Sequence, residues 1–244
     1  MTLIRPEDSY HKAQLLRLLT AIADNAYLAN LLYFKGGTCA SMLGYLDRFS
    51  VDLDFDLSDE SKTDPIRKEF KLLFRKIGLE IKDESPKVLE FLLRYKAPQH
   101  ERNSLRLDAV GYKYEANVYE PKQLPEINRT LMCQTKETMF AHKLVAITER
   151  YQKRESVAGR DIYDIHYFFI NGYRYIPEII EVRTKLKTPN YLSSLLDFIQ
   201  EKITVSLLVS DLGTLLPKEK IAFIKTNLLQ ETIIFLKDEI QRIK

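Results

Sequence analysis

The segment that decides the fold covers residues 34–57 and reads FKGGTCASMLGYLDRFSVDLDFDL. It joins a Gly-Gly turn to three carboxylates, Asp52, Asp54 and Asp56, at alternate positions of an otherwise apolar run. Side chains two apart on a strand share one face, so the spacing predicts a strand with an acidic face. Adjacent carboxylates repel and suit Mg²⁺, which proteins often hold with one or two carboxylates plus substrate phosphates. The alternative is an edge strand with a solvated acidic face.

The glycine turn precedes a short segment with apolar residues at helical spacing. This order predicts a tight turn at Gly36 and Gly37 followed by a helix N-terminus, which favours phosphate. Glycine permits close approach of the backbone to a ligand, and Thr38 can cap the helix or bind a phosphate oxygen. No GxxxxGK[ST] motif is present, so P-loop chemistry is not expected. An ordinary tight turn is the alternative.

Three motifs together resemble a known family. The first joins the glycine turn to RFSVDLDF, which begins at Arg48; the second is AHKLVAITER at residues 141–150; the third is GRDIYDI at residues 159–165. Their order and separation are similar to those of the AbiEii/AbiGii-type toxins, within the DNA-polymerase-β-like nucleotidyltransferase superfamily. The resemblance implies an α+β fold, in which a polymerase-β-like core with a mixed sheet and flanking helices precedes a mostly helical C-terminal region. We expect the core at residues 1–125 and a helical domain at 126–244 that completes the active-site cleft.

The resemblance also implies roles for individual residues. Mg²⁺ or Mn²⁺ would be held by carboxylates on two strands. The metal ligands implied are Asp52, Asp54 and Asp108; the nucleotide contacts are Gly36, Gly37, Thr38, Arg48, Ser50 and Lys143; the catalytic residues are Asp52, Lys143 and Asp161.

Structural alternatives stay open for three of these residues. Asp108 shares a predicted strand face with Arg106, so a salt bridge between them is as compatible with the spacing as metal binding. Lys143 flanks the apolar stripe of a helix, where lysines commonly extend to the surface. Asp161 falls at a helix start, where Asp is favoured as a cap. If Asp161 is functional, it either activates the acceptor hydroxyl or orients Lys143.

The implied activity is Mg²⁺-dependent transfer of a nucleoside monophosphate from an NTP to an acceptor, with release of pyrophosphate. As in several relatives, the expected acceptor is the tRNA acceptor end, and the chain would be the toxin of a toxin–antitoxin or abortive-infection system with a cognate antitoxin. Two alternatives remain: a small-molecule nucleotidyltransferase of the aminoglycoside-modifying kind, and a catalytically inactive binding module. Candidate RNA contacts are Lys12, Arg17, Lys153, Arg154, Arg160, Tyr151 and Tyr163. The sequence leaves open the preferred nucleotide, the identity of the acceptor, the antitoxin mechanism and the oligomeric state.

The composition is that of an ordinary soluble enzyme. The 244 residues are 45% hydrophobic and 29% charged, with a net charge of +3 that by itself does not indicate nucleic-acid binding. Cys39 and Cys133 lack CxxC spacing, which favours a reducing compartment over a disulfide scaffold. Charged residues interrupt every apolar run before the about 20 residues that a membrane span needs. We therefore expect a cytoplasmic protein without membrane contact.

The remaining pattern predicts a mixed first half and a helical second half. Helices are expected at residues 9–31 and 65–77, and almost throughout from residue 135. The expected strands lie near residues 79–82, 88–95 and 104–112. Prolines and Asn128 place a soft domain boundary between residues 121 and 133.

Overall fold

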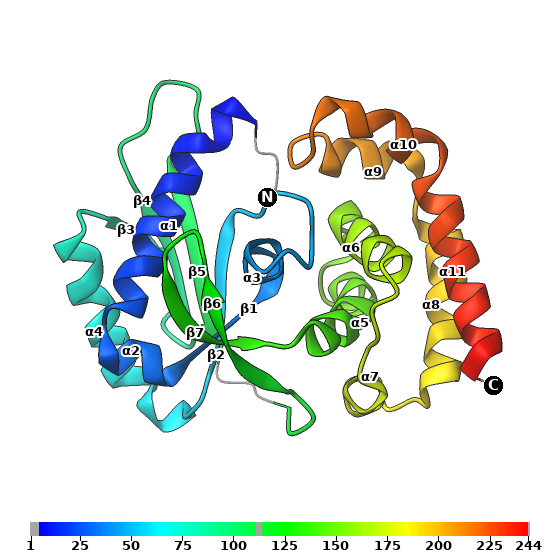
Figure 1. The fold of residues 1–244 in the computed structure, drawn as a ribbon, viewed down its shortest axis with the longest axis horizontal. Helices are drawn as coiled ribbons and strands as arrows, with labels where there is room; N and C mark the ends of the chain where they lie inside the picture. Colours follow the sequence, from blue (N-terminus) through cyan, green and yellow to red (C-terminus); the bar gives the residue numbers. More distant parts are fainter. Residues whose placement is uncertain (1–4, 111–113, 244) are drawn as a thin grey trace. The chain divides into compact units, whose positions relative to one another are not determined.

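The computed structural model describes residues 5–110 and 114–243. The chain divides into two compact units, Met1–Thr135 and Lys136–Lys244. The first unit carries the whole sheet, and the second is helical (Figure 1).

The first unit alternates helices and strands. Its elements are the short helices η1 (Pro6–Asp8) and η2 (Glu60–Lys62), the helices α1 (Ser9–Ala23), α2 (Ala26–Leu31), α3 (Gly36–Met42) and α4 (Thr63–Lys76), and the strands β1 (Leu32–Lys35), β2 (Asp52–Leu57), β3 (Glu80–Glu84), β4 (Leu89–Arg94), β5 (Ser104–Val110), β6 (Tyr119–Leu124) and β7 (Arg129–Gln134).

The described strands form one mixed sheet in the order β3-β4-β5-β2-β1-β7-β6. The acidic strand β2 is internal: it pairs in parallel with β5 on one side and antiparallel with β1 on the other. Leu53 and Phe55 of β2 are fully buried, as the alternation predicts. The alternative of a solvated edge strand is therefore wrong, because β2 has a partner strand on each side.

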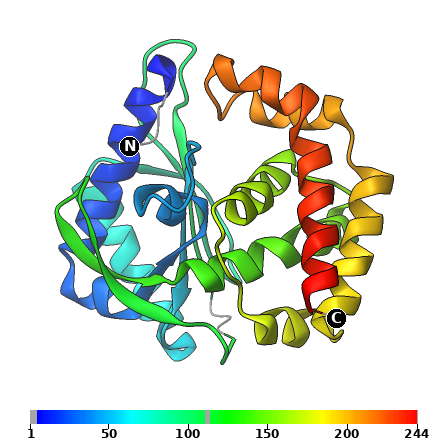
Figure 2. The same cartoon turned by 45° about the vertical axis from the view of Figure 1, so that its right-hand side comes forward.

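Helices α1 and α4 supply much of the apolar cover of this sheet. Helix α1 contacts both β2 and β5, and its Leu18 and Ile22 are fully buried. On α4, Phe70 and Phe74 meet Phe91 of β4, with ring centroids 5.8 and 5.2 Å from that of Phe91. Figures 1 and 2 show α1 running along the sheet. The core therefore lies on the side of β2 opposite to its carboxylates.

The segment expected to be one helix, residues 9–31, forms two helices. Asn25 interrupts it, because its backbone is extended and its side chain caps α2 by accepting a 3.1 Å hydrogen bond from the Leu28 N–H. The Asn25 amide also donates to Glu69 Oε1 of α4 at 2.7 Å. An N-cap of this kind begins a new helix rather than continuing the old one.

The other elements of the first unit follow the expected positions, with one addition. Helix α4 and strands β3, β4 and β5 match the expected segments, while residues 111 and 112 of the expected third strand lie outside the described residues. The segment expected to hold the domain boundary instead forms the hairpin β6–β7, and β7 pairs in parallel with β1. For this reason the sheet-bearing unit extends to Thr135, ten residues beyond the expected division at 125.

The second unit is helical, as the pattern predicts. It consists of α5 (Lys136–Arg154), α6 (Gly159–Ile170), α7 (Pro177–Thr184), α8 (Thr188–Lys202), α9 (Val205–Leu212), η3 (Lys218–Lys220), α10 (Ile221–Thr226) and α11 (Leu228–Ile243). Phe140 of α5 lies at the centre of an aromatic cluster with Phe168, Phe169 and Tyr175. Within the described part of the chain, no helix is both long and apolar enough to cross a membrane.

Candidate active site

The three carboxylates of β2 have different environments. Asp56 is buried and fully bonded: Lys35 Nζ lies 2.6 Å from its Oδ1, and the Tyr119 hydroxyl and the Gln134 amide each donate to its Oδ2 at 2.7 Å. Lys35 is therefore the cation that compensates the innermost carboxylate, and Asp56 holds strands β1, β2, β6 and β7 together. Asp52 and Asp54 remain partly exposed.

The glycine turn closes directly onto the acidic strand. Gly36 has a positive φ of 78°, and a Cβ at this position would lie 2.3 Å from Asp54 Oδ2. A Cβ at Gly37 would lie 2.8 Å from Ser50 Oγ and 3.2 Å from Arg48 Nη2. Close packing against β2 therefore requires glycine at position 36, whereas the neighbours of Gly37 are the ends of the Ser50 and Arg48 side chains. The structure brings together four of the residues expected to bind nucleotide and the carboxylate of Asp54.

Thr38 and Arg48 are anchored by backbone carbonyls. The Thr38 hydroxyl donates to the carbonyl of Asp52 at 2.5 Å, so it ties the first turn of α3 to β2 rather than capping the helix. Arg48 is buried, and its Nη1 donates to the carbonyl of Phe49 at 3.0 Å. These contacts fix the geometry between the turn and the strand.

Asp108 lies on β5 directly beside Asp54, and Arg106 lies beside Asp52. Arg106 forms its ion pair with Glu90 at 3.0 Å. Burial raises the pKa of Asp108 to about 7, and the negative charges of Asp54, Glu90 and Asp52 act in the same direction against the weaker opposite effect of Arg106. A carboxyl whose pKa is raised by burial and like charges marks a site short of positive charge.

The donor set of this face fits a hard divalent cation. In residues 5–110 and 114–243, no three His, Cys, Asp or Glu side chains are grouped so as to enclose a metal ion. Magnesium, however, is commonly held by one or two carboxylates, with substrate phosphates and water completing its shell. Asp54 beside Asp108, with Asp52 on the same face, supplies oxygen ligands of that kind.

Lys143 and Asp161 meet within the helical unit. Lys143 Nζ of α5 lies 3.2 Å from Asp161 Oδ1 and 2.8 Å from Asp164 Oδ2 of α6. Both carboxylates are almost completely buried, and Arg150 Nη2 lies 3.3 Å from Asp161 Oδ2. Lys143 is therefore not a simple surface lysine, and the Asp161 carboxylate forms ion pairs rather than a helix cap. The spacing of the RDxxD motif, one helical turn, is what puts both carboxylates on Lys143.

The candidate RNA contacts differ in accessibility. Tyr163 is buried and accepts a 2.9 Å hydrogen bond from Lys220 Nζ, so it is not available to stack on RNA. Lys12 forms an ion pair with Glu126. Arg17 lines a cavity of the first unit and is exposed.

A mixed sheet with a glycine turn packed on a carboxylate strand agrees with the class of protein that a family model shows: the chain is a nucleotidyltransferase. The family model described as the nucleotidyl transferase AbiEii toxin of type IV toxin–antitoxin systems matches residues 17–201, and the chain belongs to this family. The resemblance stated from the three motifs is therefore confirmed. A comparison with curated proteins finds no significant match.

Solved structures show the same fold. JHP933 from Helicobacter pylori is 20% identical with a TM-score of 0.55, over 99% of this chain and 93% of that chain. MenT4, a nucleotidyltransferase toxin from Mycobacterium tuberculosis, is 18% identical with a TM-score of 0.56, over 98% of this chain and 88% of that chain. The expected fold class, a nucleotidyltransferase core followed by a mostly helical region, is confirmed.

Proposed function

We propose that the chain transfers a nucleoside monophosphate from an NTP to the acceptor end of tRNA, in a reaction that depends on Mg²⁺ or Mn²⁺. The observation that carries this proposal is the contact between the glycine turn and the acidic strand. A Cβ on Gly36 would overlap Asp54, so the backbone suited to phosphate and the carboxylates suited to a cation lie side by side. Nucleotidyl transfer needs a phosphate-binding backbone and cation-binding carboxylates at the same place.

The proposed reaction assigns a task to each group of residues. The backbone of Gly36 and Gly37, with Ser50 and Arg48 behind it, binds the β- and γ-phosphates. Asp52 and Asp54, with Asp108 beside them, hold the divalent cation, which when bound stabilises the attacking and leaving oxygens. The acceptor hydroxyl then attacks the α-phosphorus in line and gives up its proton to water, the bond to the oxygen that bridges the α- and β-phosphates breaks, and pyrophosphate leaves.

For the helical unit, we propose that Lys143 binds the triphosphate and that this unit completes the cleft. The ion pairs of Lys143 with Asp161 and Asp164 support an orienting role for Asp161. A general base would have to reach the acceptor hydroxyl, whereas the Asp161 side chain is only 1% exposed and lies between Lys143 and Arg150. The buried position favours orientation over proton abstraction.

The biological part of the proposal follows from the family. As a toxin of a type IV toxin–antitoxin family, the chain would have a cognate antitoxin and would act on its target in the cytoplasm. Modification of the tRNA acceptor end would stop aminoacylation and hence translation.

The test uses purified protein with radiolabelled NTPs, Mg²⁺ and total RNA. Asp52→Asn keeps the size of the side chain and removes its charge, and we expect transfer to fall by about 100-fold or more. Relief of the Asp52–Asp54 repulsion should leave the metal-free protein equally stable or more stable by about 1 kcal/mol. Asp83→Asn, at an exposed position of the edge strand β3, is the matched control and should keep full activity.

Three outcomes would contradict the proposal. Full transfer activity or full growth arrest from a well-folded Asp52→Asn protein would refute the assigned chemistry. Label recovered in an aminoglycoside and not in RNA would identify a small-molecule nucleotidyltransferase instead. Absence of any metal-dependent turnover with all four NTPs would identify a binding module of the same fold.

A further inference from the structure

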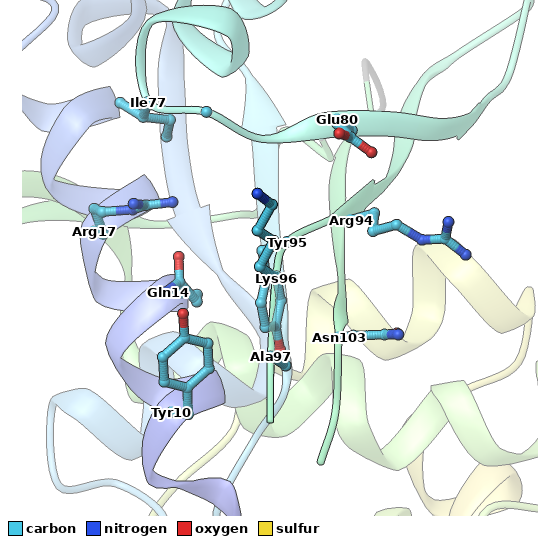
Figure 3. Close-up of a pocket in the computed structure, with 11 residues that line it drawn as sticks. Tyr10, Gln14, Arg17, Ile77, Glu80, Arg94, Tyr95, Lys96, Ala97 and Asn103 are labelled. Atoms are coloured by element: carbon cyan, nitrogen blue, oxygen red, sulfur yellow. The ribbon is translucent and has the colours of Figure 1, made fainter. Parts of the chain in front are cut away.

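A cavity lies in the sheet-bearing unit, and its lining includes neither the glycine turn nor the acidic strand. It has a volume of about 810 Å³ and is bounded by the first half of α1, the turn between α4 and β3, and the chain that follows β4 (Figure 3). Its lining includes three cations, Arg17, Arg94 and Lys96, but only one carboxylate, Glu80. None of the recorded ion pairs of the described residues includes any of these three cations. Glu80 and Arg94 are opposite one another on β3 and β4, so Arg17 and Lys96 carry the excess of positive charge in the cavity.

One stripe of α1 forms a wall of this cavity. Tyr10, Gln14 and Arg17 follow one another at helical spacing and share a face. Figure 3 shows Gln14 between the other two side chains and Arg17 directed toward Tyr95 and Lys96, which follow β4. Gln14 is only 8% exposed, and its Oε1 atom has no hydrogen-bond partner among the described residues. Buried amide oxygens are almost always bonded, so this one accepts a hydrogen bond from water or from a ligand that enters the cavity.

The aromatic side of the cavity is hydrogen-bonded, through His11, to the residue that precedes the acidic strand. The ring centroids of Tyr10 and Tyr95 lie 6.0 Å apart. The Tyr95 hydroxyl lies 2.5 Å from His11 Nδ1, and His11 Nε2 lies 2.9 Å from the carbonyl of Val51, the residue before Asp52. A carbonyl only accepts, so Nε2 donates and the neutral ring accepts the Tyr95 proton at Nδ1. Burial lowers the pKa of His11, which agrees with this neutral form.

We propose that this cavity binds one nucleotide of the RNA acceptor. Arg17 and Lys96 bind its phosphate, Tyr10 lies against its base, and Gln14 forms hydrogen bonds with the base edge. This inference rests on the proposed function, because it takes the acceptor to be RNA. An acidic peptide would need the cations alone, whereas an aromatic ring together with a buried amide matches a nucleobase.

The binding test uses the full chain with Asp52→Asn, so that no transfer occurs, and fluorescently labelled tRNA in an anisotropy titration. The double variant Arg17→Gln/Lys96→Gln should weaken binding by about 10-fold or more and reduce the slope of log K against log salt by about 1 to 2. Lys62→Gln/Lys87→Gln removes the same charge from two exposed positions of the same unit and should leave both quantities unchanged. Equal losses in the two double variants would overturn the proposal, since they would indicate general charge attraction.

Two single substitutions test the contacts with the base. Gln14→Leu removes the unpartnered oxygen at similar volume, so thermal stability should stay equal or rise while RNA binding weakens several-fold. Tyr10→Phe should retain binding and Tyr10→Leu should weaken it. Unchanged binding in Gln14→Leu and Tyr10→Leu, or displacement of tRNA by polyglutamate as readily as by polyuridylate, would refute nucleotide recognition.

The design separates this inference from the proposed function. If Asp52→Asn abolishes transfer but the cavity variants bind RNA normally, the cavity inference fails and the proposed function stands. If the cavity variants lose RNA binding but the unsubstituted chain transfers nothing to RNA, the proposed function fails and the cavity remains an RNA-binding site.

Discussion

Alanine at position 36 would bring a methyl group into the space of the Asp54 side chain. Gly36 has a positive φ of 78°, and its Cβ would lie 2.3 Å from Asp54 Oδ2 and 2.9 Å from both Cβ and Cγ of Asp54. Rotation of the carboxylate alone would not relieve the overlap with Cβ, so the turn and the strand must separate. The left-handed backbone costs about 1–2 kcal/mol, and overpacking typically adds about 1–3 kcal/mol.

Gly44 is the matched control for the backbone cost. Its φ is 73°, almost the same as that of Gly36, and a Cβ there would meet nothing within 4 Å. Gly44→Ala should therefore lower the free energy of unfolding by the backbone cost of about 1–2 kcal/mol alone and keep nucleotidyl transfer. Gly36→Ala should lose about 2–5 kcal/mol in total and nearly all transfer, because Asp54 is displaced from the glycine turn.

Urea denaturation measures the free energy of unfolding, and the labelled-NTP assay measures nucleotidyl transfer. The two glycines belong to the same compact unit, so one unfolding transition reports both variants. Equal stability and equal activity for Gly36→Ala and Gly44→Ala would refute the close packing of the turn on Asp54 and the site built on it.

Further predictions concern charge. The pKa of Asp108 is raised to about 7, above the unfolded value of about 4, so metal-free stability should fall as pH rises from about 4 to about 7. Urea unfolding of Asp108→Asn should lack that decline; an identical pH profile would contradict it. Lys143→Met leaves Asp161 and Asp164 buried without their ammonium partner and should cost about 3–5 kcal/mol in urea unfolding; an unchanged unfolding midpoint would contradict the ion pairs. The pKa of His11 is lowered, so its contribution to stability should fall as pH drops below the unfolded value of about 6.5; in urea unfolding, Asp108→Asn should show this decline and the double variant His11→Gln/Asp108→Asn should lack it.

The sequence predicts the parts of the site that are local along the chain. Strands β1 and β2 pair antiparallel and α3 connects them, so a single short segment contains the glycine turn and its facing carboxylates. The close approach of Gly36 to Asp54 follows from that local order. The raised pKa of Asp108 does not follow from local order, because it depends on which strand lies beside β2.

The sequence does not predict the hydrogen-bond partners of Asp56, because they lie far away along the chain. Asp56 is bonded to Tyr119 and Gln134, which lie 63 and 78 residues away along the chain. The sequence pattern indicates no strand at the positions of β6 and β7, because Pro121 and Pro125 are typical of loops. Since β6 is the last strand of the sheet, it tolerates Pro121 opposite Met132, as edge strands do. The apolar run from Leu131 to Cys133 is the available sequence signal for β7, and Leu131 and Cys133 are buried in the structure.

The internal position of β2 affects when the active site forms during synthesis. One neighbour, β1, precedes β2 on the chain, but the other, β5, begins only at Ser104. A nascent chain that ends before Ser104 already contains Asp52, Asp54 and the glycine turn, yet its acidic strand is still an open edge. Pairing between strands distant in sequence forms slowly compared with local contacts. The carboxylates of β2 therefore gain Asp108 as a neighbour only after β5 has been synthesised, and not when the glycine turn and the acidic strand are.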